Sequence, residues 1–125
     1  MNNFLKKLVL ITGGSSGIGL AAAKLLPARG ANVYILARRP DVLQNALREI
    51  EQSAISADQH FGVLAADISN LEQINAKLYD FAATTGTPDL LINSAGVTQP
   101  GQFEKQDPEL YRWMMEINIL GMMFV

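Results

Sequence analysis

The sequence contains no cysteine, one histidine and no apolar run long enough to cross a bilayer. Without cysteine the chain can form neither a disulfide nor a thiolate metal site, and we predict no metal site. The first apolar run begins at Leu8 and reaches Gly13 within a few residues, too short for a signal peptide or a membrane span. We therefore expect a cytoplasmic protein without a transmembrane segment.

An excess of charge of one sign is also missing. Ten basic and twelve acidic residues leave a net charge of −2, and no basic tract or stripe occurs. Nucleic acid is therefore not expected as a partner. Apolar residues make up 49% of the chain and charged residues 18%, which argues against disorder. A chain of 125 residues is long enough for one domain with a sizeable core.

Short apolar runs alternate with stretches of helical periodicity along the whole chain. This alternation predicts right-handed crossovers and a parallel sheet. We expect a doubly wound, Rossmann-like α/β fold with strand order 3-2-1-4, flanking helices and a ligand crevice at the carboxyl ends of the first and fourth strands. The first predicted strand begins directly after Lys7. The other three cover residues 31–37, 61–66 and 89–93.

The helices should begin near residues 17, 40, 69 and 108. The first should reach residue 29, with a kink or an early end at Pro27. Two N-terminal capping boxes are predicted, one from Asp41 to Gln44 and one from Ser69 to Glu72. The buried faces predicted for the second and third helices consist of Leu43, Leu47, Ile50 and Ala54, and of Leu71, Ile74, Leu78 and Phe81.

Residues 12–19 read TGGSSGIG and connect the first predicted strand to the first predicted helix. Gly13 lets the chain leave the strand in a conformation that a Cβ would resist. Gly17 leaves room for a pyrophosphate above the positive end of the helix, and Gly19 lets the helix lie close to the sheet. A P-loop is excluded because no Gly-Lys-Ser/Thr ends the turn. An ordinary strand-to-helix turn without a ligand is the alternative.

Polar residues follow the carboxyl end of each predicted strand. Ser15 and Ser16 can cap the helix or donate hydroxyl groups to phosphate or ribose oxygens. Arg38 stands where an NAD site needs an acid for the ribose hydroxyls, and its guanidinium can instead hold a 2′-phosphate. This predicts NADPH/NADP as the cofactor. Asp67 and Asn93 follow the third and fourth strands, where each could equally open a turn.

The TGGSSGIG segment resembles the TGxxxGIG cofactor motif of the short-chain dehydrogenase/reductase family, and residues 93–96 (NSAG) resemble its NNAG motif. The resemblance implies an NADP-dependent oxidoreductase that moves hydride to a ketone. It also implies that Asp67 binds the adenine amino group with help from the next residue, and that Asn118 holds a water of the proton relay. The cofactor-binding residues expected on this basis are Thr12, Gly13, Ser15, Ser16, Gly17, Ile18, Gly19, Arg38, Asp67, Ile68, Asn93, Ala95 and Gly96.

The family's catalytic Ser and Tyr-x-x-x-Lys have no counterpart here, since none of the three tyrosines is followed by lysine at the fourth position. We therefore expect residues 1–125 to be an incomplete NAD(P)-binding domain that stops before a fifth strand and is inactive alone. The resemblance further implies that the full-length protein is a homo-oligomer.

Within the family, residues 12–19, 37–39, 93–96 and 100–104 look most like 3-ketosphinganine reductases, and the tail over residues 115–121 fits too. This likeness implies a lipid-like ketone, 3-dehydrosphinganine, as substrate, and a role in sphingolipid metabolism. Two alternatives stay open at this point. The chain could be a catalytically inactive nucleotide-binding or regulatory module, or a remnant that binds nothing.

Overall fold

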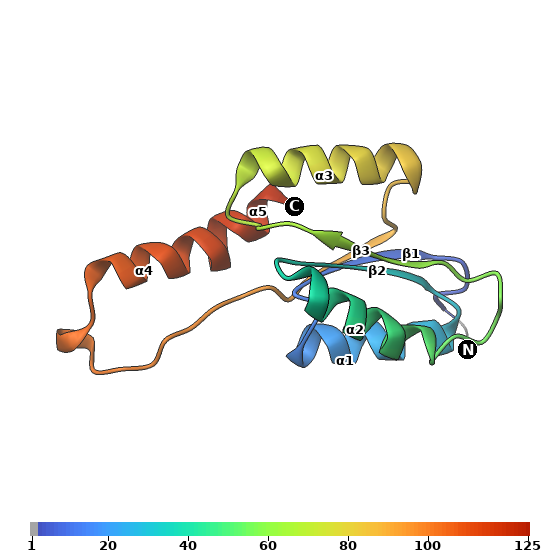
Figure 1. Cartoon of the computed structure of the whole chain (residues 1–125), viewed down its shortest axis with the longest axis horizontal. Coiled ribbons are helices and arrows are strands. Elements are labelled where there is room, and N and C mark those ends of the chain that lie inside the picture. The colour runs from blue at the N-terminus through green and yellow to red at the C-terminus, as the bar shows by residue number, and fades with distance from the viewer. Residues whose placement is uncertain (1–2) are drawn as a thin grey trace.

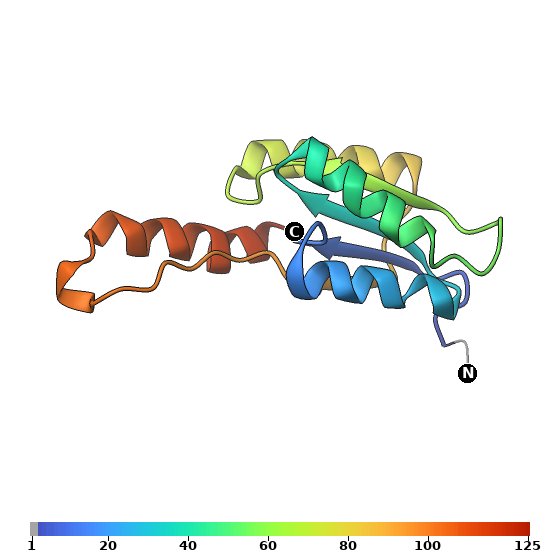
Figure 2. The same cartoon turned by 60° about the horizontal axis from the view of Figure 1, so that its bottom comes forward.

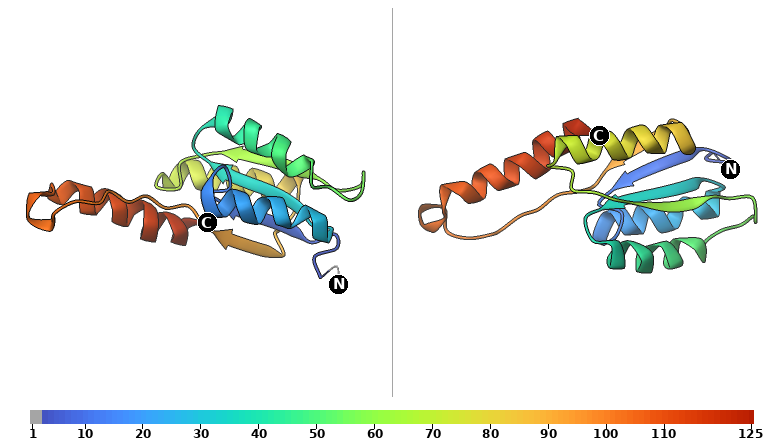
Figure 3. Two further views of the ribbon diagram at one scale, coloured as in Figure 1. Left: turned by 90° about the horizontal axis from the view of Figure 1, so that it is seen from below. Right: turned by 45° about the horizontal axis from the view of Figure 1, so that its top comes forward.

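The computed structural model describes residues 3–125 and shows a parallel sheet with helices on both faces (Figures 1 and 3). The strands are β1 (Leu8–Thr12), β2 (Asn32–Ala37), β3 (Phe61–Ala65) and β4 (Leu90–Asn93). They are ordered β3-β2-β1-β4, and all three neighbouring pairs are parallel. The predicted doubly wound α/β fold and its strand order are confirmed.

The carboxyl ends of the strands lie together at one edge of the sheet. Thr12 is paired with Leu36 on one side and with Asn93 on the other, and Ala37 is paired with Ala65. Because the register is aligned in this way, the segments that follow the four strands leave the sheet at a common edge.

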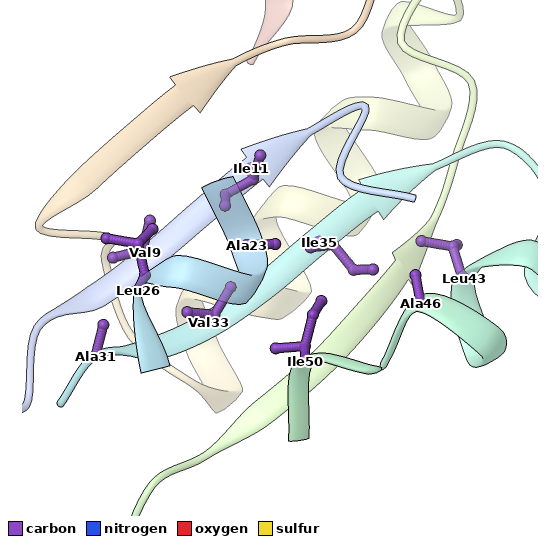
Figure 4. Close-up of a cluster of buried hydrophobic side chains, with 10 residues drawn as sticks. All are labelled: Val9, Ile11, Ala23, Leu26, Ala31, Val33, Ile35, Leu43, Ala46 and Ile50. Atoms are coloured by element: carbon purple, nitrogen blue, oxygen red, sulfur yellow. The ribbon is translucent and has the colours of Figure 1, made fainter. Parts of the chain in front are cut away.

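Two helices, α1 (Gly17–Leu25) and α2 (Pro40–Glu51), cover one face of the sheet, and α3 (Leu71–Thr84) covers the other (Figure 3). Both faces of the central strands are therefore apolar, as expected for a parallel sheet covered on both sides. Figure 4 shows the cluster under α1 and α2, which consists of Val9, Ile11, Ala23, Leu26, Ala31, Val33, Ile35, Leu43, Ala46 and Ile50. The cluster on the other face consists of Leu10, Leu36, Leu64, Ala66, Ile68, Ile74, Phe81 and Ile117.

The first helix ends early, as Pro27 predicts. α1 stops at Leu25, a single 3-10 turn covers Pro27–Arg29, and Gly30 follows with φ +87°. A left-handed glycine at this position is a common way to end a helix.

Both predicted capping boxes are wrong. Pro40 takes the first position of α2 because its ring already has a helical φ, so the cap moves back to Arg39, which makes no side-chain capping bond. The cap of α3 is Asn70, whose side chain accepts a hydrogen bond from the amide of Gln73. Ser69 is not the cap because its hydroxyl donates to the Asp67 carboxylate instead.

The predicted helix faces are correct in part. Leu43, Ile50, Ile74 and Phe81 are buried, whereas Leu47 and Leu78 are partly buried. Ala54 is exposed because α2 ends at Glu51, and Leu71 is exposed because it begins α3 beyond the edge of the sheet.

The chain after β4 forms an arm that leaves the sheet and returns to it (Figures 1 and 2). A long loop leads outward, α4 (Pro108–Met115) turns back, and a π-helical segment (Glu116–Gly121) continues into the short α5 (Met122–Phe124). Asp107 caps α4 by accepting a hydrogen bond from the amide of Glu109, and the helix begins at Pro108, as predicted. Several apolar side chains of the arm are exposed, among them those of Phe103, Trp113, Met115, Leu120 and Met123.

The amino end of β4 is tied to β1 by Asp89. Its carboxylate accepts hydrogen bonds from Lys7 Nζ at 2.8 Å and from the Leu8 amide at 2.9 Å. These two bonds lower the pKa of the Asp89 carboxyl below its ordinary value of 3.8. Across residues 3–125, none of the helices combines the length and apolar character required to traverse a lipid bilayer.

Candidate functional site

The turn after β1 needs glycine at residue 13 for two separate reasons. Gly13 has φ +65°, a conformation that side chains resist. A Cβ on Gly13 would also lie 2.7 Å from the backbone nitrogen and Cα of Ala95. The turns after β1 and β4 are therefore in direct backbone contact.

Gly17 and Gly19 have opposite surroundings. Gly17 has φ +55°, and a Cβ there would have no atom within 4 Å, so the space above it is open. A Cβ on Gly19 would overlap the carbonyl oxygen of Gly13. Gly19 therefore brings α1 against the backbone of the turn, which refines the expectation of a contact with the sheet.

Gly14 also has a packing role, which was not predicted from the sequence. A Cβ on Gly14 would overlap the side chain of Ile35 in β2. The spacing of the motif gives no signal for this contact, because the partner lies in another strand.

The first turn of α1 presents free polar groups at the open space above Gly17. Ser16 is the N-cap residue, yet its side chain makes no capping bond. The first N–H groups of a helix have no carbonyl to bind within the helix. Ile18 is 85% exposed at the same turn. Backbone amides and a serine hydroxyl at the positive end of a helix form an arrangement that can bind an anion.

An open cavity of about 120 Å³ lies at the carboxyl edge of the sheet. It lies where the segments following all four strands meet, with Ile117 of the arm completing its wall. Six of the residues predicted to bind the cofactor line it, namely Gly13, Arg38, Asp67, Ile68, Ala95 and Gly96.

Thr12 and Asn93 do not line this cavity. Thr12 is only 1% exposed, and its hydroxyl donates to Asn93 Oδ1 at 3.2 Å. The same hydroxyl accepts hydrogen bonds from the amides of Ser94 and Ala95, both at 3.2 Å. Thr12 therefore positions the backbone that lines the cavity and has no surface for contact with a ligand.

The two adjacent arginines differ in position. Arg38 lines the cavity, whereas Arg39 occupies the N-cap position of α2 and does not line the cavity. Within residues 3–125, neither forms an ion pair with an acidic side chain. Asp67 supplies the only carboxylate among the residues that line the cavity. The guanidinium of Arg38 is thus available to an anionic ligand.

Asp67 both opens a turn and lines the cavity. Its two predicted roles, as a turn residue and as a cofactor-binding residue, are therefore compatible. Its Oδ1 accepts hydrogen bonds from the Ser69 amide at 3.0 Å and the Ser69 hydroxyl at 2.7 Å. Its own amide donates to Gln73 Oε1 at 2.6 Å. The next residue, Ile68, is buried against Gly121 of the π-helical segment, where a Cβ would lie 2.8 Å from Ile68 Cγ1.

Asn118 connects the π-helical segment to the loop after β4. Its Oδ1 accepts from the Val97 amide at 2.7 Å, and its Nδ2 donates to the Val97 carbonyl at 2.8 Å. One Nδ2 proton and one Oδ1 lone pair remain for a further partner such as water. The family resemblance assigns Asn118 to a water and gives no sign of its hydrogen bonds with Val97, which hold the loop beside Gly96.

Comparison with known proteins agrees with this geometry. The model of the short chain dehydrogenase family matches residues 7–125. The PIGF/3-ketodihydrosphingosine reductase fusion protein of Schizosaccharomyces pombe is 37% identical over 120 residues, which are 96% of this chain and 24% of that protein.

Two solved structures share the fold. A short-chain type dehydrogenase/reductase from Mycobacterium ulcerans has a TM-score of 0.88 and 31% identity, over 98% of this chain and 44% of that one. L-Sorbose reductase from Gluconobacter frateurii, solved with NADPH and L-sorbose, has a TM-score of 0.86 and 26% identity, over 99% of this chain and 46% of that one. This chain spans less than half the length of these three relatives. Because the family model covers all but the first six residues, and because the fold and the glycine turn agree with it, the chain belongs to the short-chain dehydrogenase family.

Proposed function

We propose that this chain is the cofactor-binding part of an NADPH-dependent reductase. The observation that carries the proposal is the cavity at the carboxyl edge of the sheet, which is lined by Gly13 of the glycine turn and by the unpaired Arg38. The solved relative from Gluconobacter frateurii, which contains NADPH, supports a nicotinamide cofactor for a chain of this fold.

The residues present fit each part of such a cofactor. The open space above Gly17 and the free groups of the first turn of α1 suit the pyrophosphate. Arg38 suits a 2′-phosphate, because a guanidinium binds phosphate through two parallel hydrogen bonds. Asp67 and Ile68 suit the adenine ring, and Ala95 and Gly96 are small enough for a ribose to pass close to the backbone.

The bound cofactor would supply the hydride for reduction of a ketone. The residues of this chain would bind and orient it, with Thr12 and Asn118 holding the two ends of the loop beside Ala95 and Gly96. No tyrosine in the sequence stands four residues before a lysine. The proton donor is therefore assigned to the whole protein and not to these residues.

Titration with NADPH and NADH tests the cofactor assignment. Arg38→Leu should weaken NADPH binding by roughly ten- to a hundredfold, because it removes charge-assisted hydrogen bonds to the 2′-phosphate, and should leave NADH binding nearly unchanged. Arg39→Leu is the matched control, since Arg39 has the same charge one residue away and lies outside the cavity. Equal affinity for the two cofactors, unaltered in Arg38→Leu, would contradict the proposal.

For the substrate we propose a lipid-like ketone of the 3-ketodihydrosphingosine class. The Schizosaccharomyces pombe relative is named for that reductase activity and aligns with almost the whole chain, which supports this substrate class. The loop after β4 is consistent with it, because residues 94–103 contain no charged side chain and Phe103 is exposed. The full-length protein should oxidise NADPH with 3-ketodihydrosphingosine and not with a short polar ketone such as L-sorbose. The reverse preference would contradict this assignment.

A second function is a nucleotide-binding module without catalysis. The described residues offer cofactor-binding groups at the cavity, which are all that such a module requires. Tight NADPH binding without turnover of any ketone by the full-length protein would support this alternative over the reductase.

A further inference from the structure

We propose that Ser69 and Gln73 are positioning residues for recognition of the cofactor's adenine, acting through Asp67. This inference rests on the proposed function, since it concerns how the same cavity selects its ligand. Neither residue lines the cavity, and neither belongs to the TGGSSGIG or NSAG segment. What connects both of them to the cavity is their hydrogen bonding with Asp67.

All but one of the polar groups of Asp67 are hydrogen-bonded. Its amide donates to Gln73 Oε1, and its carbonyl accepts from the Asn70 amide at 3.0 Å. Its Oδ1 accepts from the amide and the hydroxyl of Ser69. Within residues 3–125, Oδ2 is the one polar group of Asp67 without a hydrogen-bond partner.

This arrangement leaves a single oriented acceptor at a cavity wall. A carboxylate that rotates freely pays conformational entropy when it binds a ligand, whereas one already fixed on one oxygen does not. The free Oδ2 can accept a hydrogen bond from an exocyclic amino group, and a carboxylate has no proton to donate to a carbonyl oxygen. The cavity should therefore prefer adenine over hypoxanthine, which has an oxygen in place of the amino group.

The two bonds from Ser69 come from the turn just before the N-cap Asn70, whereas the bond with Gln73 comes from the first turn of α3, which the core fixes. Ile74 and Phe81 of α3 are buried in the cluster on this face of the sheet. Gln73 lies one position before Ile74, so its backbone is held relative to the sheet by the same packing. The Asp67 backbone is thus tied to α3 through Gln73, and the Asp67 carboxylate is oriented by Ser69 in the turn between them.

The experiment compares the affinities of the full chain for NADPH and for its hypoxanthine analogue. The wild type should bind NADPH roughly tenfold or more tightly than the analogue, because the analogue loses a hydrogen bond to a charged group. Ser69→Ala should reduce that ratio by about threefold or more, chiefly by weakening NADPH binding, and Ser69→Thr should restore it. Gln73→Met, which keeps the length of the side chain, should reduce the ratio in the same direction.

Asn70→Ala is the control for a general loss of helix stability. It removes the cap of α3 but no side-chain bond to Asp67, so it should lower the melting temperature and leave the ratio unchanged. If Ser69→Ala and Gln73→Met weaken both ligands equally, the two residues have only a structural role and the inference is wrong. If the wild type binds neither ligand, the proposed function itself fails, and the two failures are thereby distinguished.

Discussion

At the scale of single residues, the glycines of the turn differ in what surrounds the position of the missing Cβ. That position is empty at Gly17 and is occupied by a carbonyl oxygen at Gly19. The same chemical change at the two sites should therefore have different consequences. One position faces open space, and the other faces the protein's own backbone.

Gly17→Ala should weaken NADPH binding by roughly tenfold, because the methyl group enters the space assigned to the pyrophosphate. Its cost in stability should be limited to about 1–2 kcal/mol for the left-handed backbone. Gly19→Ala should instead destabilise the fold by about 1–3 kcal/mol, since the turn and α1 must separate. Thermal unfolding and cofactor titration of both variants distinguish the two effects. Normal NADPH binding by Gly17→Ala would show that the phosphate site lies elsewhere.

Thr12 is the other single residue on which the site depends. Its hydroxyl has three hydrogen-bond partners, Asn93 and the amides of Ser94 and Ala95. Thr12→Val keeps the shape of the side chain but leaves these groups unpaired, so it should lower the free energy of unfolding by about 1–3 kcal/mol. Cofactor affinity should fall as well, because Ala95 lines the cavity. Thr12→Ser, which retains the hydroxyl, should behave nearly as the wild type in both measurements.

At the scale of elements, the contact between Lys7, Asp89 and the Leu8 amide joins the amino ends of β1 and β4. The pKa of the Asp89 carboxyl is lowered in the folded protein, chiefly by the hydrogen bond from Lys7. A carboxyl with a lowered pKa favours the folded state fully above its ordinary value of 3.8. That contribution is lost as the pH falls through the lowered value.

The melting temperatures of the wild type and of Asp89→Asn should therefore differ most at neutral pH and converge as the pH is lowered past the ordinary value of 3.8. Lys7→Gln should reproduce part of the difference, because it removes the largest cause of the shift. The pair is exposed, so the effect should be small and should shrink in high salt. A difference that grows toward acidic pH would contradict this account of the contact.

At the scale of the whole molecule, β3 and β4 form the two edges of the sheet, and β4 is the more exposed of the two. In the part of the chain that the structure describes, β4 is paired with a neighbour on one side only. Its sequence is apolar, and Leu91 is 39% exposed. An unpaired apolar edge of this kind is a template for pairing with another chain.

The isolated 125-residue chain should therefore self-associate at micromolar concentration, and Leu91→Lys should reduce that association, because a charged edge resists pairing. Leu71→Lys is the control, since Leu71 is 48% exposed at the start of α3 and not on an edge. Sedimentation velocity of the three proteins gives the comparison. An equal effect of the two lysines would attribute the association to exposed apolar surface in general.

The sequence by itself determined the order of elements and the nature of the turn after β1. Alternating apolar runs and helical periods identify strands and helices because each pattern depends on residues close together in the chain. The strand order then follows from the handedness and twist of parallel sheets. The conformation at Gly13 was predictable for the same reason, since a positive φ is a local property.

Only the tertiary structure decided which polar groups bind one another. Thr12 and Asn93 are 81 residues apart, and Val97 and Asn118 are 21 apart, so no local pattern pairs them. The cap of α3 was missed for a related reason, because Ser69 can bond either the helix or Asp67 and the fold selects Asp67. A hydroxyl or amide satisfies its hydrogen bonds with whichever partner packing brings near, and packing is decided only when the whole chain has folded.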